Sequence, residues 1–310
     1  MFVKQRRRRV FAGRLVAAAL ALTCLCGAPA ASADPVAGCA PAVATPTPAL
    51  SAQVPILDWS ENVAFDADGN LWVARLYRNA VQRYDSSGAL TATVPVEFPG
   101  AIRLGPDGLL YALYGDAPTS AVRTGGVVRL DPAAATPRAE HFVDGLAGMP
   151  NGAAFGADGA LYVAATNAGV IRVRRDGSID QEWTARAAIT GANGIVIRDR
   201  TIYLTANGNP HGRVLGIPID APERRTVVTD LTSGVPGVPD FADDLLIDDA
   251  GFLYVTTLSG KLVRIDPRGG AVCTVLTGAP MTSVVAVPGR RDELLVGTEV
   301  GAVLRVLLAP

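Results

Sequence analysis

The sequence predicts an all-β fold, a six-bladed β-propeller, on three observations. A turn followed by a strand with an aromatic residue recurs along the 310 residues, with a worn last copy. A strand of the pattern apolar-x-Arg-apolar follows it in five of the six copies. We find no useful helical periodicity between the copies. Units of four short strands, repeated at about 40 to 50 residues, are typical of blades that bury their apolar faces by stacking around an axis.

The first 33 residues differ from the rest and predict an export signal. A basic head ending at Arg14 precedes an apolar stretch, Leu15–Cys26, and Ala31-Ser32-Ala33 matches a cleavage pattern. Arg8-Arg9 resembles a twin-arginine signal, with an Arg-rich general secretory signal as the alternative. We expect a secreted, extracellular protein without a stable membrane anchor, because the apolar stretch is short and broken by Gly27.

The predicted boundaries are a signal peptide at 1–33, a Pro/Ala-rich arm at 34–51 and the propeller domain at 52–310. Two cysteines follow the signal, Cys39 and Cys273. An even count in an exported protein favours a disulfide between them, and two separate thiols are the alternative.

The charge of the chain bears on its partners. The chain has 28 basic and 29 acidic residues, and the signal contains six of the basic residues and no acidic one. The mature chain therefore has 22 basic residues against 29 acidic, a net charge of about −7. An acidic surface argues against nucleic acid or an anionic membrane as partner. We also expect a monomer that binds a small-molecule substrate.

Two columns of residues mark the blades in order. The aromatic column is Trp72, Tyr111, Tyr162, Tyr203 and Tyr254, with Leu295 last, at spacings of 39, 51, 41, 51 and 41. The arginine column is Arg83, Arg129, Arg172, Arg264 and Arg305, and Gly216 occupies its place in the fourth copy. We expect a variable fourth strand after each third strand. The chain ends on a third strand, so we expect Ala52–Ile56 to supply the missing one and close the ring by pairing the two ends.

The first strand of each blade lines the central channel, and its opening residue faces one end of that channel. These residues are Glu61, Gly100, Asn151, Asn193, Asp243, and Thr282 or Ser283. Four of the six carry carboxylate or amide oxygens, although a strand start needs no such group for folding. Converging oxygens suit a hard cation such as Ca²⁺. The alternative is that these Asn and Asp residues cap turns.

These motifs resemble the gluconolactonase, senescence-marker-protein and luciferin-regenerating-enzyme family, whose members are six-bladed propellers related to paraoxonases. The resemblance covers about Asp58 to Leu308, and its motifs are Trp59-Ser60-Glu61-Asn62-Val63, Pro150-Asn151-Gly152, Asn193-Gly194 and Asp243-Asp244-Leu245-Leu246-Ile247-Asp248. It implies that Glu61, Asn193 and Asp243 bind one divalent metal, that Asn151 contacts metal or substrate, and that Asp243 is the catalytic base. Paraoxonases use calcium, so Ca²⁺ is the expected ion, with Mg²⁺, Mn²⁺ or Zn²⁺ as alternatives.

Two positions depart from that family. Met149 stands where the sugar-lactone members have an arginine, so the resemblance does not extend to a gluconolactone-like substrate. Asp244 replaces the usual glycine after the blade-five aspartate, and it either adds a ligand or alters the turn.

The loops between second and third strands open on the face of the inner-strand starts. Tyr77 and Asp116, in these loops, are candidates for substrate contacts together with Asp244 and Asn151. His211 is the candidate catalytic histidine, and a solvated loop residue is the alternative.

The leading hypothesis is an exported, divalent-metal-dependent hydrolase of lactones or related esters, with the metal polarising the ring carbonyl and Asp243 or metal-bound hydroxide delivering water. One alternative is another reaction on the same fold, such as a lyase or a strictosidine-synthase-like condensation. The other is a non-catalytic exported propeller that binds protein or glycan.

Overall fold

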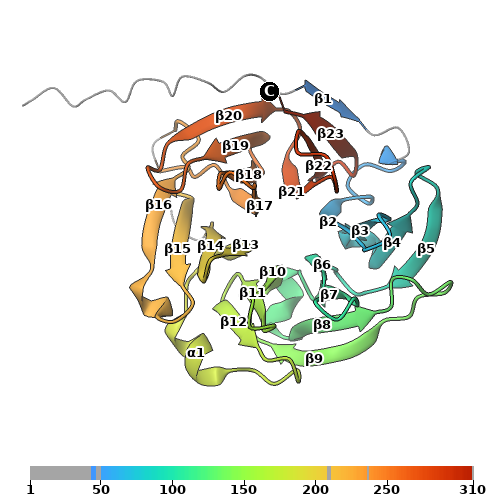
Figure 1. The fold of residues 1–310 in the computed structure, drawn as a ribbon, viewed down its shortest axis with the longest axis horizontal. Coiled ribbons are helices and arrows are strands. Elements are labelled where there is room, and N and C mark those ends of the chain that lie inside the picture. Colours follow the sequence, from blue (N-terminus) through green and yellow to red (C-terminus); the bar gives the residue numbers. More distant parts are fainter. Residues whose placement is uncertain (1–42, 47–49, 208–210, 236, 309–310) are drawn as a thin grey trace, which may run out of the picture. The chain divides into compact units, whose positions relative to one another are not determined.

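The computed structural model describes residues 43–46, 50–207, 211–235 and 237–308. All belong to one compact unit, Val36–Pro310. They form six antiparallel sheets in a ring, which confirms the predicted six-bladed β-propeller (Figure 1). The predicted signal peptide and Cys39 lie outside the described residues. None of the helices described is both long and apolar enough to cross a membrane.

The strands of each blade follow one another outward from the axis. Blade one contains β2 (Ser60–Phe65), β3 (Leu71–Arg75), β4 (Ala80–Tyr84) and β5 (Leu90–Pro95). Blade two contains β6 (Ile102–Leu104), β7 (Leu110–Tyr114), β8 (Gly125–Leu130) and β9 (Glu140–Leu146). Blade three contains β10 (Pro150–Phe155), β11 (Leu161–Ala165) and β12 (Gly169–Val173). Blade four contains β13 (Ala192–Arg198), β14 (Thr201–Ala206), β15 (Arg213–Pro218) and β16 (Thr226–Asp230). Blade five contains β17 (Ala242–Ile247), β18 (Leu253–Thr257), β19 (Lys261–Ile265) and β20 (Val272–Thr277). Blade six contains β21 (Met281–Ala286), β22 (Glu293–Thr298), β23 (Val303–Leu307) and β1 (Val43–Pro46).

The ring closes by pairing its two ends, as predicted, but with a different strand. β1 pairs antiparallel with β23, from Val43 opposite Leu307 to Pro46 opposite Leu304. The expectation that Ala52–Ile56 closes the ring is wrong, because those residues form bends and a turn. The closing strand comes from within the segment predicted to be an arm, where its prolines and alanines conceal it.

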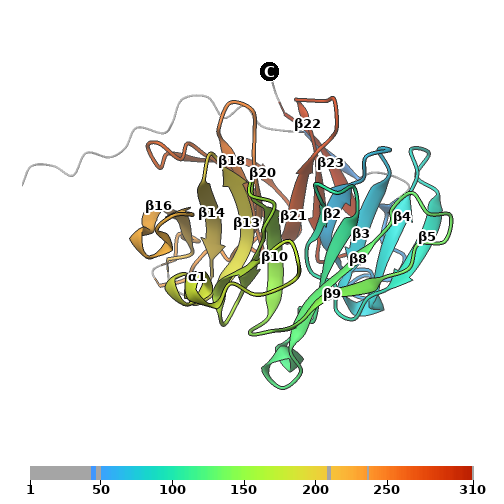
Figure 2. The same ribbon diagram turned by 60° about the horizontal axis from the view of Figure 1, so that its bottom comes forward.

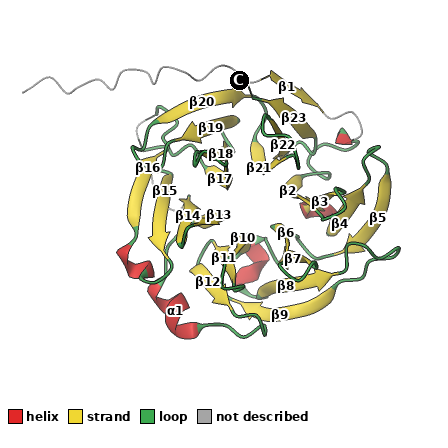
Figure 3. Ribbon diagram, viewed as in Figure 1, coloured by secondary structure: helices red, strands yellow, loops and turns green. Residues whose placement is uncertain are grey.

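Blade three departs from the predicted four-stranded plan. Its sheet has three strands, and a short helix, α1 (Gln181–Arg186), follows β12 (Figure 3). Asp180 caps the helix by accepting a hydrogen bond from the backbone N–H of Trp183. The Trp183 ring packs edge-on against Tyr162 and donates to the carbonyl of Ile219 in the neighbouring blade at 2.6 Å. The helix therefore joins blades three and four, and a six-residue helix is too short to show periodicity.

The two marker columns are cross-strand partners. The register pairs Trp72 with Arg83, Tyr111 with Arg129, Tyr162 with Arg172, Tyr254 with Arg264 and Leu295 with Arg305. In blades one and three the guanidinium lies over its aromatic partner, with a carbon-to-centroid distance of 5.7 Å in both. In blades two and five the guanidinium lies instead over Phe142 and Phe252. Contact between the arginine and an aromatic ring therefore accompanies the arginine column in four blades.

The core consists of six apolar clusters, each shared by two neighbouring blades. The cluster between blades six and one, for example, joins Leu295 and Val303 to Val63 and Val73. The inner strands of successive blades contact one another around the axis (Figure 2). The residues that open those strands are thereby brought together at one end of the channel.

Candidate metal and active site

A β-bulge marks the opening residue of five inner strands. Pairing with the second strand skips Glu61 between Ser60 and Asn62, and it skips Asn151 and Thr282 in the same way. In blades four and five it skips two residues, Asn193-Gly194 and Asp243-Asp244. A bulge releases a residue from the ladder and re-aims its side chain. The side chains at this end of the channel therefore come from residues that do not take part in strand pairing.

Close backbone contacts link these openings around the axis. A Cβ atom on Gly152 would lie 2.2 Å from the carbonyl oxygen of Asn193, and one on Gly194 would lie 2.4 Å from that of Asp243. The glycine that follows each site asparagine thus lets the next opening approach closely.

Glu61, Asn151 and Asp116 form one hydrogen-bonded group. The side-chain amide of Asn151 donates to Glu61 Oε1 and to Asp116 Oδ2, both at 3.0 Å. The indole of Trp59 donates to Glu61 Oε2 at 2.5 Å. Glu61 and Asp116 are each 6% exposed. The structure therefore joins three predicted site residues from three different blades.

Asp243 and Asn193 retain free oxygens near this group. The Asp243 side chain is buried and has no hydrogen-bond partner among the described residues. Oδ1 of Asn193 is likewise buried without a partner. A buried acceptor without a donor is costly, so these oxygens suit an additional ligand.

Burial, followed by the charges of neighbouring carboxylates, raises the pKa values of the acidic groups at the site. Burial, and then the charge of Glu61, raise the pKa of Asp116 well above its ordinary value. Burial, followed by the charges of Glu61, Asp244 and Asp116, raises that of Asp243 well above its ordinary value. Burial also raises the pKa of Glu61, against hydrogen bonds from Trp59, Asp116 and Asn151. Mutual repulsion of this kind indicates a place where positive charge is missing.

The donor set fits a hard divalent cation. It combines two carboxylates, Glu61 and Asp243, with the amides Asn193 and Asn151, and all of them offer oxygen. Among the described residues no group of three or more His, Cys, Asp or Glu side chains is arranged as metal ligands. A cation here would therefore need the two amide oxygens as well as water or substrate.

Asp244 points to a different set of partners from Asp243. It is 3% exposed, accepts from the Asn62 amide at 3.0 Å and pairs with the Arg103 guanidinium at 3.3 Å. Its predicted role as a substrate contact stays a prediction, and its observed contacts are within the protein.

Tyr77 and His211 occupy the loops predicted to surround the site. Tyr77 is 43% exposed and packs edge-on against Trp59, with ring centroids 5.5 Å apart. Tyr77 therefore contacts Trp59, which in turn donates to Glu61. His211 is half-exposed, with Nδ1 4.0 Å from Oδ2 of Asp230 on the outer strand β16. Its catalytic role stays a prediction, since these contacts do not join it to the carboxylates.

Sequence reasoning missed Arg103, and gave no role to Trp59 or Asn62. Trp59 and Asn62 flank Glu61 and were visible in its motif. Arg103 was hidden because blade two opens with Gly100 and offers no ligand of its own. A charged residue within a three-residue apolar strand was the available signal.

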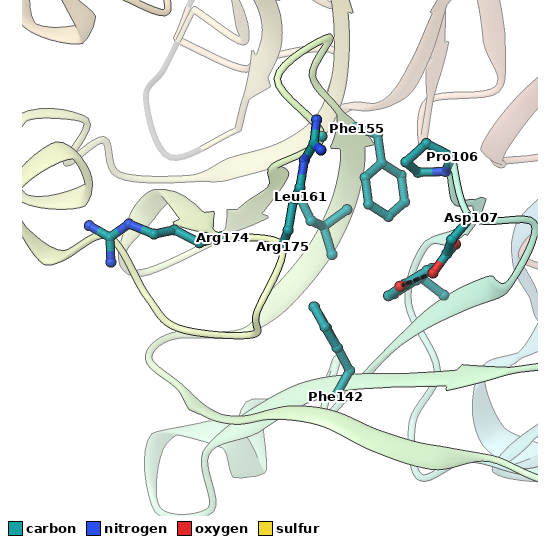
Figure 4. Close-up of a pocket in the computed structure, with 9 residues that line it drawn as sticks. Pro106, Asp107, Phe142, Phe155, Leu161, Arg174 and Arg175 are labelled. Atoms are coloured by element: carbon teal, nitrogen blue, oxygen red, sulfur yellow. Dashed lines mark hydrogen bonds between the residues drawn. The ribbon is translucent and has the colours of Figure 1, made fainter.

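Two cavities of the described residues are lined by residues other than Glu61, Asn151, Asn193 and Asp243. One of about 430 Å³ follows the axis, is lined by inner-strand residues such as Val63, Ile195, Leu245 and Val284, and has Arg103 in its wall. Another, of about 360 Å³, lies between blades two and three at the Asp-Gly turns, where Asp107 accepts from Tyr111 (Figure 4). Phe155, the last residue of β10, lines that second cavity, whereas Asn151 lies near the strand's start.

Solved structures with this fold include a gluconolactonase from Xanthomonas campestris, which is 15% identical, with a TM-score of 0.63 over 88% of this chain and 99% of that one. A luciferin-regenerating enzyme is 17% identical, with a TM-score of 0.65 over 86% and 95%. A calcium-binding regucalcin from Agrobacterium tumefaciens is 18% identical, with a TM-score of 0.65 over 84% and 92%. No protein-family model and no curated protein sequence matches the chain.

These likenesses place the chain among six-bladed propellers of the gluconolactonase and regucalcin type in fold. Other chemistries share that fold. A virginiamycin B lyase from Staphylococcus aureus is 12% identical, with a TM-score of 0.57 over 86% and 99%. A PQQ-bound aldose sugar dehydrogenase from Streptomyces coelicolor is 16% identical, with a TM-score of 0.63 over 87% and 100%. Function must therefore be argued from the site.

Proposed function

We propose that the protein is a divalent-metal-dependent hydrolase of lactones or related esters. The observation that carries this proposal is the group formed by Glu61, Asn193 and Asp243 at the channel end. The unpartnered oxygens of Asn193 and Asp243, together with the unbalanced negative charge of the carboxylates, favour a hard cation there. Calcium is the expected ion, because carboxylate and amide oxygens with added water suit it best.

The chain's own residues account for the remaining requirements of hydrolysis. A bound cation would act as a Lewis acid toward a carbonyl group and offset charge on its oxygen. Asp243 is the candidate base, because its carboxylate has no hydrogen-bond partner among the described residues and can take a proton from water. The new bond joins water oxygen to the acyl carbon, the acyl–oxygen bond of the ring breaks, and the proton passes to the leaving oxygen. Asn151 holds Glu61 and Asp116 in place through its amide hydrogens.

The loops on the site face favour a substrate with an apolar part. Several of the exposed large apolar side chains belong to loops that adjoin the openings of blades one, five and six: Ile56, Tyr77, Phe241 and Val300. Ile56 and Phe241 also adopt a left-handed backbone, with φ of 70° and 51°, which is unusual for a β-branched or bulky residue. Together with Met149 in place of arginine, this favours an alkyl- or aryl-substituted lactone over a sugar lactone.

The proposal is tested by calcium titration calorimetry and a hydrolysis panel on the mature protein. The panel contains alkyl-substituted γ- and δ-lactones, aryl esters and gluconolactone, each with and without chelator. We expect turnover of the apolar lactones, loss of turnover with chelator, and incorporation of labelled oxygen from water into the product. Glu61→Ala and Asp243→Asn should lose both calcium binding and turnover, whereas Asp85→Asn, on an exposed turn, should retain them.

Three outcomes would redirect the assignment. Turnover without label from water points to a lyase or a condensation on the same fold. Calcium binding without turnover points to a non-catalytic binding propeller. Retention of full activity in both Glu61→Ala and Asp243→Asn would remove the proposed mechanism.

A further inference from the structure

A second polar group lies directly beside the candidate metal site. Asn62, Arg103 and Asp244 come from the inner strands of blades one, two and five. The Asn62 amide donates to Asp244 Oδ2 at 3.0 Å, and Arg103 donates to Asn62 Oδ1 at 2.7 Å and to Asp244 Oδ1 at 3.3 Å. Each of the three side chains contacts the other two, so the group is closed.

This group spans the channel. Blades one and five are not neighbours in the ring, because blade six lies between them. The contact from Asn62 to Asp244 therefore ties two inner strands that no sheet hydrogen bond connects. Asn62 and Asp244 are 4% and 3% exposed. In such surroundings a charge-assisted hydrogen bond is strong and geometrically demanding.

Two members of the group directly follow candidate ligands in sequence. Asn62 follows Glu61, and Asp244 follows Asp243. The distance from blade one to blade five sets the separation of the Glu61 and Asp243 carboxylates. A cation that both must reach tolerates only a narrow range of separations.

Arg103 fixes the group electrostatically. Its guanidinium also donates to the backbone carbonyl of Ile102 at 2.8 Å, and the side-chain Oδ1 of Asn62 accepts from the Ile102 N–H at 3.1 Å. Asp244 thus has its cationic partner, Arg103, within the protein. That pairing directs the second of two successive aspartates away from the candidate cation, and leaves Asp243 with free oxygens.

We propose that Asn62, Arg103 and Asp244 form a positioning clamp that holds Glu61 and Asp243 at the separation a divalent cation requires. The clamp residues do not touch substrate. They act through the two carboxylates that they neighbour. This inference rests on the proposed function, and its test separates failure of the clamp from failure of the metal site.

The test compares Arg103→Met, Arg103→Lys and the double variant Arg103→Met/Asp244→Asn with the wild type. Arg83→Met is the matched control, since Arg83 donates to the carbonyls of Pro132 and Ala134 on the outer part of a blade. Calcium affinity is measured by calorimetry, terbium luminescence reports the cation's surroundings, and chelated samples are unfolded thermally to give stability.

We expect Arg103→Met to weaken calcium binding by roughly ten- to a hundredfold, the range typical of residues that orient metal ligands. Arg103→Lys should restore most of the affinity, because it keeps the charge. The double variant should recover part of it, since Asn62 can still donate to an asparagine carbonyl at 244. If Arg103→Met weakened calcium binding only by destabilising the fold, Arg83→Met would weaken it equally. The terbium signal of the folded protein would then be unchanged.

Calcium affinity within twofold of wild type in Arg103→Met, with binding lost in Glu61→Ala, would overturn the clamp and leave the metal site standing. Binding that survives in Glu61→Ala and Asp243→Asn, or is absent from the wild type, would overturn both. If Arg103→Met does not fold, Arg103→Lys and the double variant decide. Both should then bind calcium more tightly than Glu61→Ala, and equal loss in all three contradicts the proposal.

Discussion

The molecule places aspartates in two regions with opposite surroundings. At the Asp-Gly turns, Asp66 accepts from the Trp72 indole at 2.8 Å, and Asp158 accepts from Arg172 at 2.7 Å and from Tyr162 at 3.1 Å. At the channel end, Asp116 and Asp243 face other carboxylates. Burial opposes ionisation of Asp158, but the Ala160 N–H and Arg172 hold its pKa below the ordinary value. The pKa values of Asp116 and Asp243 are raised.

This difference separates residues that stabilise the blades from residues kept for binding. The turn aspartates satisfy buried donors and recur with the blades. The channel aspartates lower the stability of the chain when no cation is bound. Unfavourable local charge that the rest of the fold sustains is typical of functional sites.

The largest expected effect comes from Asp243→Asn. Loss of this carboxylate should reduce lactone hydrolysis by at least roughly a hundredfold, because ligand and base are removed together. In the presence of chelator the same variant should be more stable than wild type by about 1–3 kcal/mol, because a buried repelling charge is gone. Steady-state kinetics and urea unfolding measure the two. A variant that were both inactive and destabilised would contradict the assignment of Asp243 to binding.

Asp66→Ala should have the opposite profile. It leaves the buried Trp72 N–H and the Asn70 side chain without their acceptor, and should lower the free energy of unfolding by about 2–3 kcal/mol. Calcium affinity should not change. Urea unfolding gives the stability, with Asp85→Ala on an exposed turn as control. Equal losses in the two variants would show that burial of the turn aspartate is irrelevant.

The two regions should also respond to pH in opposite directions. The pKa values of Glu61, Asp116 and Asp243 are raised in the folded state. These groups therefore contribute most to the free energy of unfolding below about pH 4, the ordinary carboxyl pKa. That contribution is lost as the pH rises through their folded-state pKa values. The turn pairs behave conversely: the lowered pKa of Asp158 gives stability that is lost as pH falls through its folded-state value. Chelated wild type should therefore lose more stability than Asp243→Asn between pH 5 and 8. Thermal unfolding across pH measures this, and parallel curves would refute it.

The smallest effect concerns the fourth blade, which lacks the arginine of its column. Gly216 lies opposite Tyr203, and a Cβ atom there would meet Thr226 Oγ1 at 3.3 Å. Gly216→Arg should stabilise the protein by about 0.5–1 kcal/mol through contact with the tyrosine ring. Gly216→Ala is the control for loss of glycine alone. Thermal unfolding of the two decides, and no difference between them would mean that the column is not a stabilising contact here.

The sequence predicted most of the fold because each blade repeats a local code. The aromatic and arginine columns could be read from spacing alone, and their pairing explains why they recur. α1 and β1 were missed for the same physical reason: each occurs once. A six-residue helix held by Asp180 and Trp183 is too short to show a period, and β1 is defined by a partner more than two hundred residues away.

Some residues of the candidate site could be predicted from the sequence and others could not. Glu61, Asn151 and Asp116 were predicted. Glu61 and Asn151 come together because blade openings share a register around the axis, and Asp116 reaches them from the loop that follows β7. Arg103 was not predicted, since its contacts depend on which blades face each other across the channel. Trp59 could have been singled out from its place two residues before Glu61, but the direction of its indole is a three-dimensional fact.

The closing strand also constrains the order of folding. β1 lies near residue 45 and its partner β23 near residue 305, so this sheet cannot form until β23 has been synthesised. Five blades can be assembled on strands that follow each other directly, whereas the sixth waits for a long-range contact with a large entropic cost. A chain shortened by only its last strand would keep its beginning unpaired. Ring closure therefore depends on all six blades having been synthesised.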